Sequence, residues 1–261
     1  MLQNPGDDMP RKFYLIGHNP NSVREAVAYL QSGANALEPD VCYDQGSNSF
    51  YVHDEVADFL PNWLYSGPTL TSYLDDLVQA LRGNQSFHLA LISFDLKTPY
   101  SYDINAQLYD IIRTHFSQFF PKVSILTTVG KSKGLDFLTQ VSPQHQNEAV
   151  GVDGGTTPDD VQTFFQPRGL HVTYANGTTF IPVTWVKGKI ARAIQLRDQS
   201  PGRIFKLVYV WTVISSSHMK FYLDMGVDGI ITGNAALLSS LLKTQYSNQY
   251  ILATQDDLPF A

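Results

Sequence analysis

Short apolar segments recur about eight times along the 261-residue chain, and segments with apolar residues at helical spacing lie between them. The apolar segments are residues 13–17, 35–41, 89–94, 123–126, 149–152, 170–174, 205–211 and 227–231. Near-continuous apolar strands that alternate with helices are typical of a parallel sheet covered by helices. About eight such units predict an α/β fold, a (β/α)8 barrel. Because the composition does not change along the chain, we expect a single domain over residues 1–261.

Charge and cysteine content exclude several classes of protein. The formal net charge is −6 and the pI about 5.5, so nucleic acid is not an expected partner. No apolar stretch reaches the roughly 20 residues that a transmembrane segment needs. Cys42 is the only cysteine, so no intrachain disulfide can form. Residues 1–10 are polar and acidic, unlike a signal peptide, and we expect a monomer.

Two carboxylates, Glu38 and Asp40, stand at the end of the second apolar segment, NALEPDV at residues 35–41. In an extended strand, residues i and i+2 point to the same face, so both side chains can reach one spot. Hard anionic oxygens that share a spot suit Mg²⁺ or Ca²⁺, and without a cation they repel each other. An E-x-D pattern on its own is weak evidence for a metal site, because a solvated strand end is the commoner explanation.

Other polar residues stand at the ends of the apolar segments in the same way. They are His18, Asp95 with Lys97 two residues later, Asp153, Trp211, and His53 at the end of a hairpin predicted for residues 43–54. In a (β/α)8 barrel the C-terminal ends of all strands meet at one face, which is where such barrels carry their chemistry. A lone histidine is more often structural; His18, after a strand glycine, and His53, after a hairpin strand, gain weight mostly from the motifs described next.

The order of these motifs resembles the glycerophosphodiester phosphodiesterase-like barrels, a TIM-barrel superfamily of the PLC-like phosphodiesterase type. The matching motifs are Gly17-His18, GANALEPDV at 33–41, Val52-His53-Asp54, FDLKT at 94–98 and GVDGIIT at 226–232. Within this superfamily the chain is similar to the sphingomyelinase D/phospholipase D toxin branch. That similarity rests on DLKT at 95–98, YVWTV at 209–213 and the tail ATQDDLPF at 253–260.

The resemblance implies a site for one divalent cation, Mg²⁺, with Ca²⁺ or Mn²⁺ as alternatives. The implied metal ligands are Glu38, Asp40 and Asp95, and the implied acid/base pair is His18 and His53, with neither histidine assigned to one role. Cleavage of a phosphodiester needs a cation for the phosphoryl oxygens, a base for the attacking hydroxyl and an acid for the leaving alkoxide. These five side chains meet that need.

The resemblance also implies residues that bind the substrate. Lys97 would contact the phosphate, while Asp153, Tyr209 and Trp211 would line the head-group side of the pocket. A tryptophan at a strand end can stack on a quaternary ammonium group, although a core position is the alternative for Trp211. The tail, residues 246–261, would close the bottom of the barrel.

We therefore expect a Mg²⁺-dependent phospholipase D-type phosphodiesterase, sphingomyelinase D-like, that releases the head-group alcohol from sphingomyelin or lysophospholipids. These lipids carry a hydroxyl near the phosphodiester, and its intramolecular attack would give a cyclic phosphate. The substrate would be presented by a membrane or a micelle. The resemblance to toxins favours a secreted protein, and a cytoplasmic one is the alternative.

Two other functions stay open. A glycerophosphodiester phosphodiesterase, acting on soluble deacylated phospholipids, is favoured by His53-Asp54 and by Ile214, which stands where the spider toxins have an aspartate. A non-catalytic barrel that binds lipid or protein is the second alternative, and retention of every metal and histidine position argues against it. Because Cys42 is alone, the disulfide that braces the toxins' catalytic loop cannot form here.

Overall fold

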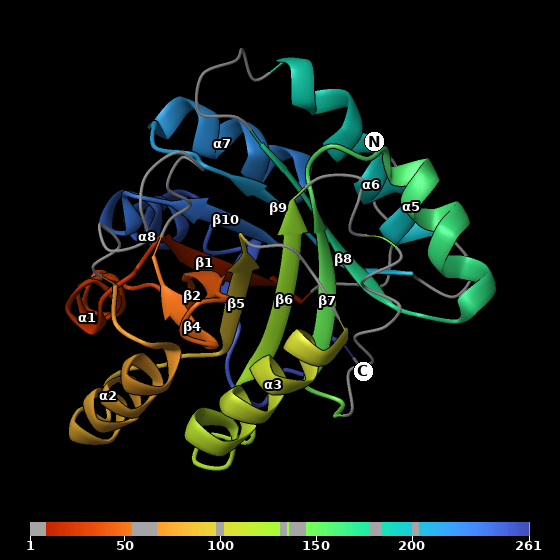
Figure 1. Ribbon diagram of the computed structural model, residues 1–261. Coiled ribbons are helices and arrows are strands. Elements are labelled where there is room, and N and C mark those ends of the chain that lie inside the picture. The colour runs from red at the N-terminus through yellow and green to blue at the C-terminus, as the bar shows by residue number, and fades with distance from the viewer. Residues whose placement is uncertain are drawn as a thin grey trace.

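Eight parallel strands form a closed barrel in the computed structural model, which describes residues 9–53, 67–97, 102–130, 135, 145–177, 184–199 and 204–260 (Figure 1). The strands are β1 (Arg11–His18), β2 (Ala36–Glu38) continued by β3 (Asp40–Asp44), β5 (Leu91–Leu96), β6 (Ser124–Gly130), β7 (Glu148–Asp153), β8 (Val172–Gly177), β9 (Phe205–Trp211) and β10 (Gly229–Thr232). Since β1 pairs with both β2 and β10, the ring is closed. The prediction of a (β/α)8 barrel is confirmed.

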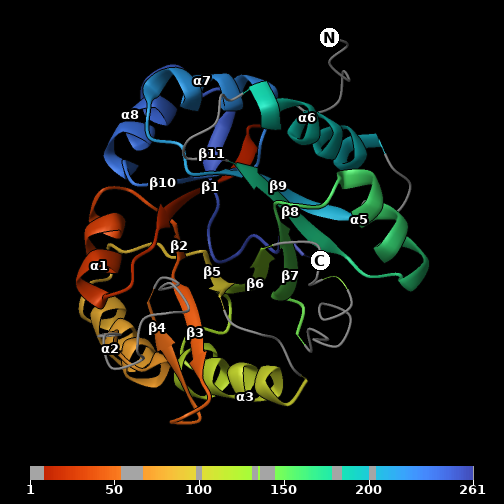
Figure 2. The ribbon, with the colours of Figure 1, turned by 45° about the horizontal axis from the view of Figure 1, so that its top comes forward.

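Helices surround the barrel on its outer side (Figure 2). They are α1 (Val23–Gln31), α2 (Leu70–Gly83), α3 (Tyr102–Ile112), α5 (Pro158–Phe165), α6 (Thr184–Gln199), α7 (Ser216–Met225) and α8 (Ala235–Gln245). A π-helical turn (Arg113–Ser117) extends α3, and a 3-10 turn (Gln166–Arg168) extends α5. None of the helices in the described ranges combines the length and the apolar character required to cross a bilayer.

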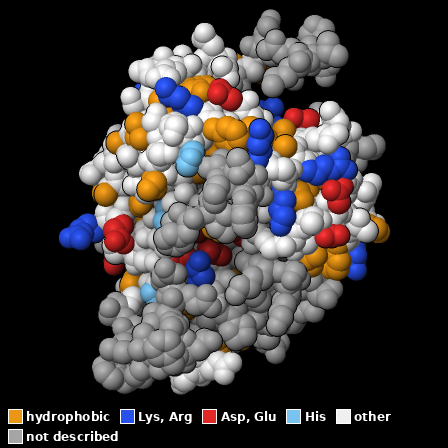
Figure 3. Space-filling model, turned by 90° about the horizontal axis from the view of Figure 1, so that it is seen from above, with side chains coloured by type: hydrophobic (Ala, Val, Ile, Leu, Met, Phe, Trp, Pro, Cys, Tyr) orange, Lys and Arg blue, Asp and Glu red, His pale blue; other side chains and the backbone are white. Residues whose placement is uncertain are grey.

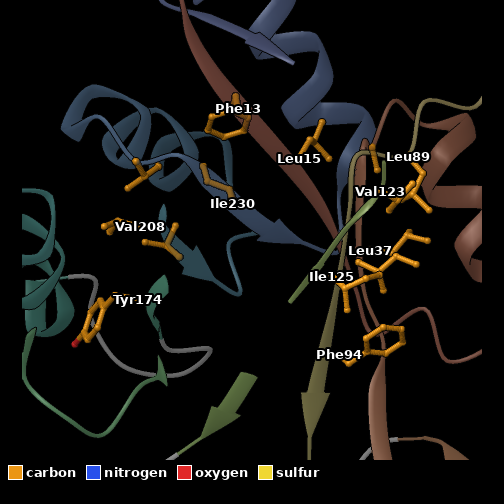
Figure 4. Packing of buried hydrophobic residues seen from close by; sticks show 14 of the residues in the cluster. Phe13, Leu15, Leu37, Leu89, Phe94, Val123, Ile125, Tyr174, Val208 and Ile230 are labelled. Carbon is orange, nitrogen blue, oxygen red and sulfur yellow. The ribbon is translucent and has the colours of Figure 1, made fainter. Parts of the chain in front are cut away.

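The apolar side chains divide into two layers because neighbouring strand residues point to opposite faces. On β1, Leu15 packs outward in the large cluster between strands and helices, while Ile16 packs inward in the barrel interior. Figure 4 shows part of the outer cluster, in which Leu37 and Phe94 come from neighbouring strands. Each strand is thus buried on both faces, which explains its near-continuous apolar sequence.

Several strand ends differ from the sequence prediction, and two of them illustrate the difference. The strand expected at residues 89–94 spans Leu91–Leu96, so Asp95 lies within β5 and not after it. The strand expected at residues 170–174 spans Val172–Gly177. In both cases the ladder continues past the last apolar residue, because backbone pairing does not require an apolar side chain; Asp95 pairs with Thr128 of β6.

The second strand is interrupted at Pro39, which has no N–H to donate to a ladder. Before the interruption, β2 pairs with both β1 and β5; after it, β3 pairs with β5 and forms an antiparallel hairpin with β4 (Ser49–Val52). The described part of the predicted hairpin is confirmed, while Asp54 lies outside the described residues, as does Thr98 of the FDLKT motif. The interruption therefore separates the two carboxylates Glu38 and Asp40.

At the opposite end of the barrel, the buried Asn35 joins three segments of the chain. Its Oδ1 accepts a hydrogen bond from the Leu15 N–H at 2.7 Å, and its Nδ2 donates to the carbonyls of Phe13 and Ala253 at 3.0 and 2.8 Å. The strand β11 (Tyr250–Leu252) pairs with β1, and both Ala253 and Phe260 belong to the interior cluster. These contacts support the prediction that the tail closes the bottom of the barrel. That role of the tail and the single domain over residues 1–261 both stay predictions.

Replacing Asn35 by alanine is expected to lower the free energy of unfolding by about 3 kcal/mol, because the buried Leu15 N–H and Ala253 carbonyl lose this partner. Urea unfolding followed by circular dichroism measures the change. Asn84→Ala, which removes hydrogen bonds only from an exposed turn, serves as the control and should cost less than about 1 kcal/mol. Equal effects of the two variants would contradict the role of Asn35 as a brace.

Candidate active site

The predicted site residues gather at the C-terminal rim of the barrel. Strand register places His18 beside Glu38 and Asp40 beside Asp95. Further round the rim, Asp153 and Trp211 are the last residues of β7 and β9. Figure 3, seen from the side toward which β6 points, shows acidic side chains and a basic one at the bottom of a hollow. The rim therefore joins residues that lie far apart in the sequence.

Three carboxylates form the centre of this rim. Glu38, Asp40 and Asp95 are 5%, 0% and 7% exposed, and one oxygen of each lies within 4.8 Å of the others. Burial, together with the charges of the other two acids, raises the pKa of Glu38 well above its usual range. Burial also raises the pKa of Asp95. Buried acids so close together need positive charge, and their oxygens are the donors that hard divalent cations prefer.

Lys97 supplies part of that positive charge. Its Nζ lies 2.6 Å from Asp95 Oδ2 and 3.0 Å from Asp40 Oδ1. Burial alone would lower the pKa of Lys97, but the charges of Asp95 and Asp40 outweigh burial and raise this pKa. One lysine cannot balance three carboxylates, so the cluster fits a divalent cation held by Glu38, Asp40 and Asp95.

Backbone and side-chain donors hold the carboxylates from outside the cluster. The Asn19 N–H donates to Glu38 Oε2 at 3.3 Å, and Thr128 Oγ1 donates to Asp95 Oδ1 at 3.4 Å. Asn21 makes two hydrogen bonds to Asp40. The sequence prediction missed these donors, since they belong to none of the motifs on which it rested. The spacing of Asn19 and Asn21 just after His18 is the one signal that places them near the rim.

Backbone register brings both predicted histidines to the level of the carboxylate cluster. His18 ends β1 and pairs in register with Glu38. His53 follows β4; since Val52 pairs with Val41 in antiparallel register, His53 comes next to the level of Asp40. Cys42 Sγ contacts the His53 carbonyl at 3.4 Å. The two imidazoles thus come from two different elements at the carboxylate end of the barrel.

A second polar group lies on the far side of the rim. The indole N–H of Trp211 donates a hydrogen bond to Asp153 Oδ1, and the Trp211 ring packs on the interior cluster. Burial, and after it the charge of Asp95, raises the pKa of Asp153 to about 8. Tyr209 points to the same face of β9 two residues earlier and is buried in the barrel interior, beneath Trp211. Ile214, beyond β9, is exposed.

The fold and the acidic rim together define a class, the (β/α)8 barrels with a carboxylate cluster at the C-terminal rim. Similar solved structures include a glycerophosphodiester phosphodiesterase from Parabacteroides distasonis, with a TM-score of 0.65, 16% identity, and 91% of this chain and 100% of that one covered. Another is an Oleispira antarctica phosphodiesterase in complex with the product sn-glycerol-3-phosphate, with a TM-score of 0.63, 15% identity, and coverage of 88% and 97%. At such identities the likeness establishes the fold.

Residues 8–260 match the family model described as Dermonecrotic toxin SPH, so the chain belongs to that family. The dermonecrotic toxin LarSicTox-alphaIB2c of Loxosceles arizonica is 27% identical over 276 residues, covering 95% of this chain and 98% of the toxin. LruSicTox-alphaIC1c of Loxosceles rufescens is 29% identical over 274 residues, with coverage of 95% and 98%. The resemblance seen in the sequence is confirmed, and with it the class of phospholipase D-type phosphodiesterase.

The raised pKa of Asp153 leads to a prediction about stability. Between its unfolded pKa, about 4, and its folded pKa near 8, the folded state keeps a proton that the unfolded state releases. Rising pH therefore favours unfolding over this range. Between pH 5 and pH 8, without divalent cations, the wild type should lose more stability than Asp153→Asn in urea titrations. The exposed Asp256→Asn should follow the wild-type profile, and parallel profiles for all three would contradict the prediction.

Proposed function

We propose that this protein is a Mg²⁺-dependent phospholipase D-type phosphodiesterase that releases the head-group alcohol from sphingomyelin and lysophospholipids. The observation that carries the proposal is the buried cluster of Glu38, Asp40 and Asp95 beside Lys97, in a chain that matches a toxin family over nearly its whole length. Buried acids with so little compensation cost stability, and such strain is characteristic of functional sites.

In the proposed site, Glu38, Asp40 and Asp95 hold the divalent cation, and Lys97 binds the phosphate. When bound, the cation supplies positive charge for the phosphoryl oxygens. Because the cluster contains only carboxylate donors, hard cations such as Mg²⁺, Ca²⁺ and Mn²⁺ suit it. Mg²⁺ is the ion we propose, since it uses few protein carboxylates and keeps positions for phosphate oxygens.

The proposed nucleophile is the substrate's own hydroxyl. Its oxygen forms a bond to phosphorus while the bond from phosphorus to the head-group oxygen breaks, so the products are a cyclic phosphate and an alcohol. One of the imidazoles His18 and His53 takes the proton from the attacking hydroxyl, and the other gives a proton to the leaving alkoxide. An intramolecular nucleophile benefits from a high effective molarity and needs no bound water.

The head group is proposed to lie toward Asp153, Tyr209 and Trp211. A hydrogen bond to Asp153 orients the Trp211 ring, and an indole face attracts quaternary ammonium groups such as choline. The carboxyl group of Asp153 adds acceptor oxygens on the same side. The lipid would approach from a membrane or micelle surface, with a monomeric enzyme. Relatives that are named toxins support a secreted protein.

A glycerophosphodiester phosphodiesterase is the second candidate function. The solved structures with this fold include phosphodiesterases of that name, one of them in complex with sn-glycerol-3-phosphate. The exposed Ile214 also leaves the rim after β9 without the acid that the toxins carry at this place. This reaction would use the same cluster but a soluble substrate and water as the nucleophile.

A choline-release assay separates the two functions. Micellar sphingomyelin, lysophosphatidylcholine and diacyl phosphatidylcholine are compared with glycerophosphocholine, each with Mg²⁺ or with excess chelator. We expect release from the first two only, a cyclic first product in phosphorus NMR, and no turnover after chelation. Preference for glycerophosphocholine would favour the second candidate, and full activity in chelator would refute the metal site. Mg²⁺ binding without any turnover would indicate a non-catalytic barrel.

The proposed acid/base pair predicts that His18→Asn and His53→Asn each lower turnover at least about a hundredfold, since a positioned acid or base contributes about 10²–10⁴. The double variant should be little worse than either single one, because the pair acts as a unit. Circular dichroism should remain near native. His115→Asn is the control; His115 contacts Asp75 in the helix layer and should keep wild-type turnover. Near-normal turnover of a rim variant would remove that histidine from the mechanism.

A further inference from the structure

The loop between β1 and α1 approaches both carboxylates of the second strand. It consists of Asn19, Pro20, Asn21 and Ser22, and it follows His18 directly. The Asn19 N–H donates to the Glu38 carbonyl at 3.1 Å as well as to the Glu38 side chain, while the Asn21 N–H donates to the Asn19 carbonyl at 2.8 Å. Backbone contacts therefore fix the loop against the acidic cluster before its side chains are considered.

The side chain of Asn21 makes a two-point contact with Asp40. Its Oδ1 accepts a hydrogen bond from the Asp40 N–H at 3.0 Å, and its Nδ2 donates to Asp40 Oδ2 at 3.1 Å. The register between β1 and β2 ends at the pair His18–Glu38, so β1 offers the Asp40 N–H no further strand partner. The amide of Asn21 continues the ladder in place of a backbone.

The contact with Asn21 gives the two carboxylate oxygens of Asp40 different partners. Oδ2 is held by Asn21, and the other oxygen, Oδ1, lies 3.0 Å from the Lys97 Nζ inside the acidic cluster. Two hydrogen bonds, one to the backbone and one to the carboxylate, fix both the position of Asp40 and the rotation of its carboxylate. An Asp40 free to rotate would spread its charge over several orientations and bind a cation less tightly.

Asn21 itself is held firmly. The next residue, Ser22, caps α1. Its side chain accepts a hydrogen bond from the Glu25 N–H, and the Glu25 carboxylate accepts one from the Ser22 N–H. This reciprocal capping box fixes the start of the helix. The preceding Pro20 is buried. Asn21 thus joins a rigid helix start to a carboxylate at the rim.

We propose that Asn21 is a positioning residue that orients Asp40 for a divalent cation. The inference rests on the metal site of the proposed function, and it adds a residue that does not itself touch the ion. Replacing such a partner of a metal ligand typically costs 10–100-fold in metal affinity. The cost should therefore appear in cation binding in the absence of any substrate.

The test is isothermal titration calorimetry with Mg²⁺ on the full chain. Asn21→Ala should weaken binding by about 10–100-fold, and saturating Mg²⁺ should restore most of the turnover. The matched control is Asn147→Ala. Asn147 also donates two hydrogen bonds, to the carbonyls of Pro121 and Val123, but at the opposite end of the barrel. This control should lose stability and keep its Mg²⁺ affinity.

Two further variants make every outcome decisive. The first, Asp95→Asn, removes a proposed ligand and should lose Mg²⁺ binding. If the wild type itself binds no Mg²⁺, the proposed metal site is refuted, independently of the result for Asn21→Ala. If Asp95→Asn loses binding while a folded Asn21→Ala stays within about twofold of the wild type, only the positioning role is overturned. Should Asn21→Ala not fold, Asn21→Ser, which keeps a polar side chain but is too short for the two-point contact, decides. An intermediate affinity supports the proposal, and wild-type affinity overturns it.

Discussion

The structure depends on an electrostatic constraint: three buried carboxylates of like charge must be held within 4.8 Å of one another. In the part of the chain that the structure describes, Lys97 is the one lysine or arginine that contacts them. Each carboxylate stands on a strand of a closed barrel, so the backbones that carry the carboxylates cannot move apart without breaking strand pairing. The barrel thus keeps an unfavourable charge arrangement that a flexible loop would relax.

The two ends of the barrel treat buried charge differently. At the N-terminal ends of the strands, Asp228 accepts hydrogen bonds from Arg197, Arg11 and the backbone of β9. At the same end, Arg113 donates two hydrogen bonds to the Glu148 carboxylate, from Nε to Oε1 and from Nη2 to Oε2. These acids are fully compensated, as a purely structural role requires. At the C-terminal rim, one lysine, Lys97, is shared by Asp40 and Asp95, and this asymmetry distinguishes the carboxylate cluster from the acids at the other end.

The sequence predicts the barrel and the shared face of Glu38 and Asp40 because both follow from local patterns, whereas Asp95 is expected as the third acid through the family resemblance. The alternation of apolar segments and helices determines the barrel, and the i, i+2 spacing of Glu38 and Asp40 determines which acids share a face. Contacts between segments are not visible in this way. The hydrogen bond from Trp211 to Asp153, the clamp of Asn21 on Asp40 and the extension of β5 through Asp95 all require strand register, which no single segment contains.

Strand register also explains how the positions of the acids can stay fixed while other residues of the rim vary. The clustered acids Glu38, Asp40 and Asp95 stand within adjacent paired strands, so the positions of their backbones are set by the ladder. Beyond the end of β9, by contrast, Ile214 belongs to no ladder and is exposed. In the proposed site, a substitution there would alter the surface beyond β9 without disturbing the acids. In the proposed function, paired strands thus fix the acids, while residues beyond the strand ends can vary, and with them substrate preference, without moving the acids.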